Sequence, residues 1–251
     1  MTLSDVSVDL APTEGVRLWS LRLDDRVPES ARAASILSPE ERERASKILD
    51  PRRRARFVRV RVAVRELLGA ALGEPPASVP IRHGHAGKPY LDGSPVCFSV
   101  SHARDVALIG ITRAGPVGVD VQGPRPGHDL LRIANRFFHE SEAEAIAALP
   151  PGAAADAFLR AWTAKEAVVK ALGIGIWGST SRVVVDLEPG GKLRLLAVPG
   201  TVPAERWSLI EAPVPAGGRA AAAIPREGVE LTAGRVHRLD RRPGAESRPR
   251  A

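Results

Sequence analysis

Short stretches of the chain alternate between apolar and polar residues, which is the pattern of half-buried β-strands. The alternation is clear over residues 16–23, and a strand is also predicted over 96–101. The stretch 106–112 is almost continuously apolar, so this strand is expected to be buried on both faces. Further strands are predicted over 117–122, 183–187, 193–198, 207–211, 220–224 and 229–239.

Apolar residues three and four apart mark the longer helical segments. The pattern is clearest over 51–72, a stretch that also carries seven arginines. Ser38-Pro39-Glu40-Glu41 is typical of a helix start, because proline suits the first turn and acidic residues favour it. Helices are further predicted over 130–138, 141–149 and 156–172, the last of them stopped by Gly173.

The element order is strand, helices, strands, and then the same order again. It predicts an α+β fold of two similar α+β subdomains joined near Gly115-Pro116. We expect an N-terminal subdomain over 1–115 and a C-terminal subdomain with the metal site over 116–228. Residues 229–251 form a basic, proline- and glycine-rich strand and tail, expected to be partly disordered.

The composition is that of an ordinary soluble protein, with 251 residues, 44% hydrophobic and 26% charged. The single cysteine, Cys97, excludes an internal disulfide and a thiolate zinc cluster. No apolar run approaches the roughly 20 residues that span a bilayer, and the N-terminus lacks the pattern of a signal peptide. These features predict a cytoplasmic protein with no membrane partner.

The net charge of +7 is compatible with nucleic acid, an acidic protein or a phosphorylated metabolite as partner. The basic residues are nearly all arginines. The few lysines are therefore informative, because a compact ammonium suits a phosphate. They are Lys47, Lys88, Lys165, Lys170 and Lys192.

Lys165 falls near the middle of the apolar face of the helix predicted over 156–172, with Glu166 and Lys170 along one edge. A desolvated ammonium is costly unless it meets an anion or reaches water. We interpret this segment as a helix that holds two cations and a carboxylate at the rim of a cleft, which would suit phosphate and a metal. The alternative for Glu166 and Lys170 is an ordinary surface ion pair four residues apart.

Asp120 and Gln122 project from the same face of the strand over 117–122, beside Gly118. Two oxygen-bearing side chains on one strand face can begin a magnesium site, which Glu166 could complete from the helix. The alternative is a strand end with polar residues in solvent. Gly87-Lys88-Pro89 and Ser101-His102 are two further candidate phosphate contacts, each weak alone.

Five motifs occur in order along the chain. They are Gly87-Lys88-Pro89, Phe98-Ser99-Val100-Ser101-His102, Gly118-Val119-Asp120-Val121-Gln122, Phe137-Phe138-His139-Glu140-Ser141-Glu142, and Trp162-Thr163-Ala164-Lys165-Glu166-Ala167 with Lys170 and Gly173. As an ordered set they resemble the 4'-phosphopantetheinyl transferase superfamily, in particular its monomeric, Sfp-like branch. The resemblance covers about residues 38–187.

The resemblance implies an Mg²⁺-dependent holo-[acyl-carrier-protein] synthase. Such an enzyme transfers the 4'-phosphopantetheine of coenzyme A to a serine of an apo acyl or peptidyl carrier protein and releases adenosine 3',5'-bisphosphate. Carrier proteins of this kind serve fatty-acid, polyketide or nonribosomal-peptide synthesis. An acidic carrier is the expected partner of this basic chain, and nucleic acid is not expected. The resemblance also implies a monomer that is folded as a pseudo-dimer of two similar α+β subdomains, with the active site and coenzyme A in the cleft between them.

Residue by residue, the resemblance implies a metal set, a catalytic set and a coenzyme set. The metal ligands are Asp120, Gln122 and Glu166; the catalytic residues are Glu166, Asp120 and His102; the coenzyme contacts are Arg53, Arg56, Arg61, Lys88, Ser101, His102, Lys165 and Lys170. Glu166 also helps to deprotonate the acceptor serine, Arg56 is an alternative register to Arg53 and Arg61, and Glu142 matches a further family acid.

Three positions depart from the family pattern. Gln122 stands where glutamate is usual, Ser99 where asparagine is usual, and Ala103 where a serine is often found. A neutral amide at 122 predicts weaker magnesium binding before coenzyme A arrives, because each ligand charge adds attraction to a hard cation.

Two other functions are compatible with the sequence. A protein of the same fold could bind coenzyme A or a carrier without catalysis, for which Gln122 is the supporting feature. A basic nucleic-acid-binding module is the second, supported by the arginine-rich helix and the tail, although the chain is only 4% aromatic and has no recognition motif.

Overall fold

The computed structural model describes residues 15–23, 30–84, 86–124, 127–175, 180–188, 191–212, 214, 218–226, 229 and 231–238. The helices are α1 (Ser30–Ile36), α2 (Pro39–Ser46), α3 (Pro51–Leu72), α4 (Leu130–Phe137), α5 (Glu140–Ala147) and α6 (Pro151–Leu172), with short 3₁₀ turns η2 (Pro76–Ser78), η3 (Thr180–Arg182) and η4 (Ala204–Arg206). The strands are β1 (Val16–Arg22), β2 (Ile81–His83), β3 (Pro89–Leu91), β4 (Cys97–Ala103), β5 (Val106–Thr112), β6 (Gly118–Gln122), β7 (Val184–Asp186), β8 (Arg194–Ala197), β9 (Ser208–Ala212), β10 (Arg219–Ile224) and β11 (Leu231–Arg238).

The strands form two main sheets, and the predicted α+β class is confirmed. The first sheet has the order β11-β1-β5-β4 and the second β6-β10-β9, while β2-β3 and β7-β8 form two small ribbons. The last strand, β11, pairs in parallel with β1, the first described strand. The strand expected within 229–239 therefore joins the N-terminal sheet. The tail beyond residue 238 lies outside the described residues.

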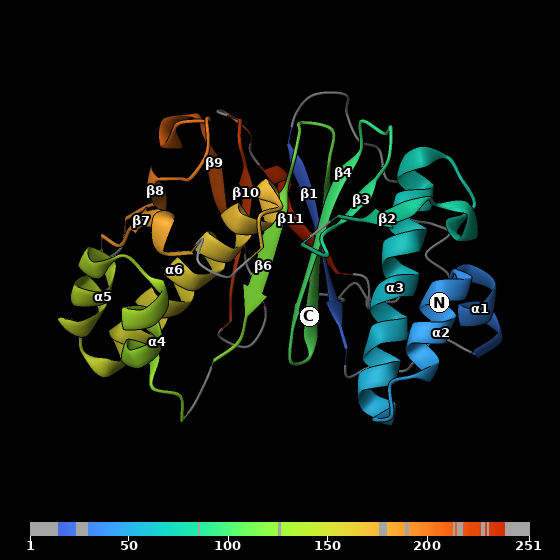
Figure 1. Ribbon diagram of the computed structural model, residues 1–251, viewed down its shortest axis with the longest axis horizontal. Coiled ribbons are helices and arrows are strands. Elements are labelled where there is room, and N and C mark those ends of the chain that lie inside the picture. The colour runs from blue at the N-terminus through green and yellow to red at the C-terminus, as the bar shows by residue number, and fades with distance from the viewer. Residues whose placement is uncertain are drawn as a thin grey trace, which may run out of the picture.

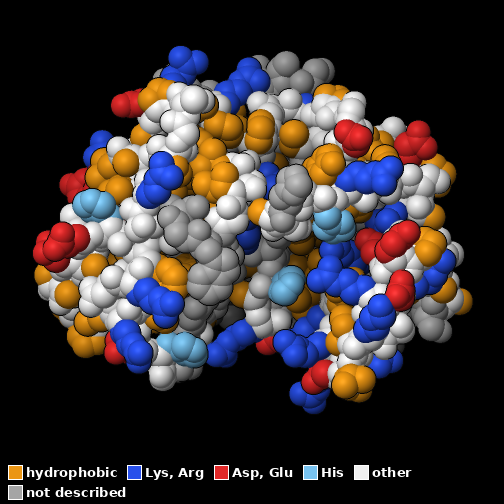
Figure 2. Space-filling view, viewed as in Figure 1, with side chains coloured by type: hydrophobic (Ala, Val, Ile, Leu, Met, Phe, Trp, Pro, Cys, Tyr) orange, Lys and Arg blue, Asp and Glu red, His pale blue; other side chains and the backbone are white. Residues whose placement is uncertain are grey.

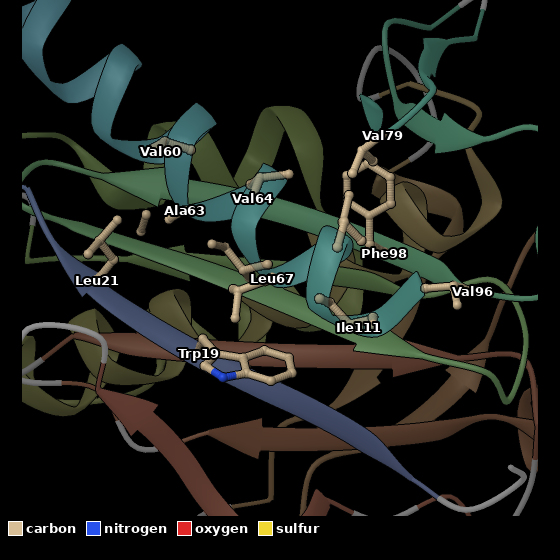
Figure 3. Close-up of a cluster of buried hydrophobic side chains, with 14 of the residues drawn as sticks. Trp19, Leu21, Val60, Ala63, Val64, Leu67, Val79, Val96, Phe98 and Ile111 are labelled. Carbon is tan, nitrogen blue, oxygen red and sulfur yellow. The ribbon is translucent and has the colours of Figure 1, made fainter. Parts of the chain in front are cut away.

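The two sheets lie between two long helices (Figure 1). Helix α3 covers the outer face of the first sheet, and the cluster between them includes Trp19, Val64, Leu67 and Ile111 (Figure 3). Helix α6 packs on the second sheet, where Val168 and Ala223 belong to one cluster. This arrangement leaves the inner faces of both sheets to pack against each other.

A third cluster fills the space between the sheets. It contains Val16, Leu18, Leu108, Val117, Val119, Val121, Ala220 and Ala222, each with at most 3% of its surface exposed. Val119 and Val121 of β6 thus share one face with Val117 just before the strand, as the period of two predicts. In β5, Leu108 faces this cluster while Ile109 faces α3, so the prediction that β5 is buried on both faces is confirmed.

Two serine hydroxyls join the sheets where β4 meets β6. The backbone N–H of Val119 donates to Ser99 Oγ at 3.1 Å, and that of Val121 donates to Ser101 Oγ at 3.4 Å. Both serines are buried. We call this junction the β4–β6 seam, and it brings side chains of the first sheet beside Asp120 of the second.

Gly118 lets α6 lie directly on β6. A Cβ atom at this position would fall on the backbone of Ala167 and Ala171. Neither backbone atom can move without distorting the helix, so only glycine fits this close approach. Two residues further along β6, this contact holds Asp120 within reach of side chains from α6.

Local sequence signals explain the helix ends. Ser38 and Glu41 form the capping box of α2, and Asp50 caps α3. Both long helices end at a glycine with positive φ, Gly73 and Gly173. No helix among the described residues is long and apolar enough to cross a membrane.

Candidate active site

Asp120 is the centre of a buried polar cluster at the seam. Its side chain projects from β6 toward α6, and the residue is only 1% exposed. Oδ1 accepts a hydrogen bond from Ser101 Oγ at 2.6 Å and pairs with the Lys170 ammonium at 2.6 Å. Lys170 Nζ also donates to Ser101 Oγ at 3.1 Å. Strand β4, strand β6 and helix α6 thus each supply one member of the cluster.

Gln122 is hydrogen-bonded to the second oxygen of the same carboxylate. Its Nε2 donates to Asp120 Oδ2 at 3.1 Å, so both oxygens of Asp120 have donors. The two side chains lie on one face of β6, as the alternation predicts. The alternative of a strand end with its polar residues in solvent is wrong for Asp120, which is buried.

Glu166 lies on α6 one turn before Lys170 and is 4% exposed. Residues four apart share a helix face, so Glu166 lies on the side of α6 from which Lys170 reaches Asp120. The alternative of an exposed i,i+4 ion pair is excluded because Glu166 is buried and Lys170 is engaged by Asp120. Lys170 and Asp120 are thus in direct contact, and Glu166 is a buried carboxylate one helical turn before Lys170.

His102 follows Ser101 at the same junction, with an exposed outer edge. Desolvation of the ring lowers the pKa of His102, and the nearby positive charge of Lys170 lowers it further. The imidazole is accordingly held in its neutral form near pH 7. A neutral ring next to this cluster can still donate one hydrogen bond to an anion.

Lys165 lies elsewhere, which corrects its predicted position at the rim of a cleft. It is fully buried, and its ammonium pairs with Glu142 Oε2 at 2.5 Å and donates to the carbonyl oxygens of Thr180 and Val183. It also lies 4.9 Å from the centroid of the Phe138 ring. Burial lowers the pKa of Lys165, and Glu142 opposes that shift.

Glu142 is itself held from three sides. Besides Lys165, it accepts the N–H of His139 at 2.9 Å and the N–H of Val185 at 2.8 Å. The resulting buried pair ties α5, α6 and the segment from η3 to β7 together. A buried Lys165 requires an anion, and this anion is Glu142 on another helix. The charge of Lys165 is thus balanced inside the protein.

Lys88 is also bound to the protein itself. Its Nζ donates to the carbonyl oxygens of Val117 at 3.0 Å and Ala171 at 3.2 Å. Ala171 lies in the last turn of α6, whose carbonyls have no helical partner. Lys88 therefore satisfies this turn and connects the β2–β3 hairpin to β6 and α6, and burial lowers its pKa.

A cavity of about 300 Å³ opens beside Lys88. Its walls come from the hairpin (Pro89, Tyr90), the start of β4 (Cys97, Phe98) and the end of α6 (Leu172). Cys97 is half-buried, and this burial raises the pKa of its thiol. A largely apolar cavity of this size suits a flat organic group better than an ion.

The predicted arginines lie along α3 in different settings. Arg61 is half-buried, 3.9 Å from Glu41 and stacked 5.6 Å from the Phe57 ring. The positive charge of Arg61 also contributes to lowering the pKa of His102 and of His83 in β2. Arg53 is exposed, and Arg56 pairs with Asp105. Of these arginines, Arg61 is near enough to His102 to act on it electrostatically, while Arg56 has an acidic partner of its own.

Basic and histidine side chains gather in the middle of one face of the molecule, over the region between α6 and α3 (Figure 2). Burial and the neighbouring charge of Glu41 act on Arg61 in opposite directions, and burial, the larger effect, lowers its pKa. The face as a whole presents positive charge to an approaching anion.

Sequence reasoning did not identify two contributions to this site. The hydroxyl of Ser99 was noted only as a departure from a family pattern, whereas it binds the backbone of β6. Glu142 had no assigned partner, although His139 and Glu142 form the capping box of α5. The three-residue spacing from His139 to Glu142 was readable, but the contact of Glu142 with Lys165 joins two separate helices.

Comparison with known proteins gives a consistent result. Residues 116–224 match the model of the 4'-phosphopantetheinyl transferase superfamily. The chain is 32% identical over 203 residues to 4'-phosphopantetheinyl transferase HetI of Nostoc sp., covering 79% of this chain and 83% of the relative.

Two other relatives match shorter segments. The 4'-phosphopantetheinyl transferase AcpT of Salmonella typhimurium is 36% identical over 117 residues, which is 46% of this chain and 59% of AcpT. The 4'-phosphopantetheinyl transferase of Bacillus subtilis is 28% identical over 149 residues, which is 59% of this chain and 65% of the relative.

Proposed function

Because this chain belongs to the 4'-phosphopantetheinyl transferase superfamily, we propose that it transfers 4'-phosphopantetheine from coenzyme A to a serine of an apo carrier protein, at the β4–β6 seam. The observation that carries the proposal is the cluster in which Lys170 of α6 meets Asp120 of β6, one helical turn from Glu166. Carboxylates and an ammonium grouped at one buried junction suit a metal-bound diphosphate.

The chemistry of the donors fits Mg²⁺. Asp120 and Glu166 offer carboxylate oxygens and Gln122 an amide oxygen, which are the ligands that this hard cation prefers. Among the described residues, no group of three or more His, Cys, Asp or Glu side chains is placed to hold a metal ion, so the proposed set depends on the amide of Gln122 as its third member. When bound, Mg²⁺ would neutralise charge on the diphosphate of coenzyme A.

The residues of the seam divide the remaining work. We assign to Glu166 the acceptance of the serine proton, so that the serine oxygen forms a bond to the phosphorus that carries pantetheine. The bond from that phosphorus to the bridging oxygen then breaks, and adenosine 3',5'-bisphosphate leaves with both electrons. Lys170 and the neutral His102 donate hydrogen bonds to phosphate oxygens, which stabilises the charge of the leaving group.

The other predicted coenzyme contacts receive different proposals. Arg61, with Arg53 or Arg56 further along α3, would hold the 3'-phosphate end by charge. Lys88 would act by holding the hairpin and the cavity in place, since its ammonium already binds two carbonyls. Lys165 would fix the position of α6, and with it Glu166, through its pair with Glu142.

We further propose that the carrier is acidic and that the enzyme acts as a cytoplasmic monomer of two similar subdomains. The net charge of +7 supports an acidic partner. Raising the ionic strength should then raise the apparent KM for the carrier, because salt screens long-range attraction. An unchanged KM would count against charge-guided docking.

The test is to incubate the protein with an apo acyl or peptidyl carrier, coenzyme A and MgCl₂, and to measure the intact mass of the carrier. We expect the carrier to gain one phosphopantetheine, and a carrier with serine replaced by alanine to stay unmodified. Coenzyme A binding without any mass gain across several carriers would instead support a non-catalytic binder of this fold.

A further inference from the structure

The carboxylate of Asp120, a proposed metal ligand, already pairs with a cation. Its Oδ1 pairs with the ammonium of Lys170 at 2.6 Å, and the same oxygen accepts the Ser101 hydroxyl. Its Oδ2 accepts the amide Nε2 of Gln122 at 3.1 Å. Both oxygens therefore face hydrogen-bond donors.

The orientation of Gln122 adds to this effect. With Nε2 directed at Asp120, the amide contributes a donor to the carboxylate, whereas a metal would require its oxygen. A glutamate in the same place could only accept. The combination of Lys170 and Gln122 therefore satisfies Asp120 in a way that a pair of carboxylates could not.

We propose that Lys170 is an internal counter-ion that competes with the divalent metal for Asp120 and yields only when a diphosphate draws its ammonium away. The inference rests on the proposed function and goes beyond it. Its consequence is that metal and coenzyme bind as a coupled pair, and that the free protein holds the metal weakly.

Charge and burial support this exchange. Asp120 is 1% exposed, so a charge opposite it is only partly screened by water, and releasing Lys170 without a replacement cation is costly. The Lys170 side chain is 24% exposed and long, so its ammonium can turn toward an anion that approaches from solvent. A diphosphate offers the ammonium a new partner while the divalent ion replaces it at Asp120.

The experiment measures Mn²⁺ binding to the intact protein by the electron paramagnetic resonance signal of free Mn²⁺, with and without saturating coenzyme A. A titration of coenzyme A alone corrects for Mn²⁺ that it binds itself. We expect coenzyme A to tighten Mn²⁺ binding about tenfold or more. By reciprocity, Mn²⁺ should tighten coenzyme A binding by the same factor in calorimetry.

Two variants test the role of the counter-ion. Lys170→Gln removes the competing charge but keeps a donor, and should tighten Mn²⁺ binding to the free protein about tenfold. Gln122→Glu should act in the same direction, because an added negative charge attracts a divalent ion twice as strongly as an ammonium. If circular dichroism shows that Lys170→Gln does not fold, the Mn²⁺ affinity of Gln122→Glu is used to test the proposal.

Arg104→Gln is the matched control. Arg104 is exposed, and its Cδ lies 3.9 Å from where a Cβ on Gly123 would sit, so this variant removes a positive charge beside Gln122 without touching Asp120. It should change Mn²⁺ binding by less than about threefold, because exposed charges are screened.

The outcomes separate the two proposals. Suppose that the carrier is modified, but that Lys170→Gln changes Mn²⁺ binding no more than Arg104→Gln does. The counter-ion proposal is then wrong, and the transferase function stands. Where Lys170→Gln does not fold, the same comparison is made with Gln122→Glu. The counter-ion proposal is likewise wrong if coenzyme A leaves Mn²⁺ binding by the wild-type protein unchanged. If neither coenzyme A binding nor carrier modification occurs, both proposals fall.

Discussion

Helix α6 carries two lysine–carboxylate pairs that differ in what surrounds them. The side chains of Lys165 and Glu142 are 1% and 2% exposed. Asp120 is equally buried, with a side chain 2% exposed, but its partner Lys170 is 24% exposed. Lys165 also donates to two backbone carbonyls, whereas Lys170 donates to a serine hydroxyl. One pair is closed within the protein, and the other is open at one end.

The difference arises from the elements that face the helix. Lys165 faces α5 and the segment from η3 to β7, which supply an acid and two carbonyls from one side of the molecule. Lys170 faces the seam between two sheets, where β4 and β6 are joined by side chains. The same residue type on one helix is thus enclosed by protein in one place and partly exposed to solvent in the other.

Lys165→Met should give the largest effect. It leaves the carboxylate of Glu142 buried without its cation, so the free energy of unfolding should fall by about 3–5 kcal/mol. Urea unfolding followed by circular dichroism measures the loss. The double variant Lys165→Met with Glu142→Gln removes the charge as well and should recover part of the stability.

Lys170→Gln sharpens the comparison when measured in the same way. Asp120 keeps its bonds from Ser101 and Gln122, and water reaches the open end, so the loss of stability should be clearly smaller than for Lys165→Met. Equal losses from the two variants would show that the open and closed pairs do not differ.

Ser101→Ala should have an intermediate effect. It removes a hydroxyl that donates to Asp120 and accepts from Lys170 and from the N–H of Val121. A stability loss of about 1–2 kcal/mol is expected from the unsatisfied partners. Ser99→Ala is the matched control, because it removes a hydroxyl of the same seam that accepts the N–H of Val119.

His83→Gln should have the smallest effect, visible only in the pH dependence. Desolvation, followed by the charges of Arg61 and Arg44, lowers the pKa of His83 in the folded state. As pH falls below about 6.5, the unfolded chain binds a proton that the folded protein resists, so stability declines. The variant should show a shallower decline in unfolding free energy between roughly pH 7 and 5. An identical slope would contradict this assignment.

Much of this arrangement was readable from local patterns. Helix α3 begins and ends at the predicted residues 51 and 72, because proline, helical periodicity and Gly73 all act within the segment. The face of β6 that carries Asp120 followed from alternation alone. Signals that lie within one element were therefore sufficient for most of the elements and for the face of β6 that carries Asp120.

Contacts between distant segments were not readable. Helix α6 begins at Pro151, five residues before its prediction, and helix α1 and strand β2 were not predicted because their apolar patterns are short. The pairing of β11 with β1 and of Lys165 with Glu142 joins segments that only the packed fold brings together. A buried lysine could be recognised in the sequence, but its partner could not.

The central claim is that Glu166 takes the proton of the acceptor serine at the seam. The most direct measurement is the single-turnover rate of carrier modification by Glu166→Gln, with coenzyme A affinity measured in parallel by calorimetry. We predict that the rate falls about 10²–10⁴-fold while coenzyme A affinity changes far less. A variant that modifies the carrier at the wild-type rate would contradict the account.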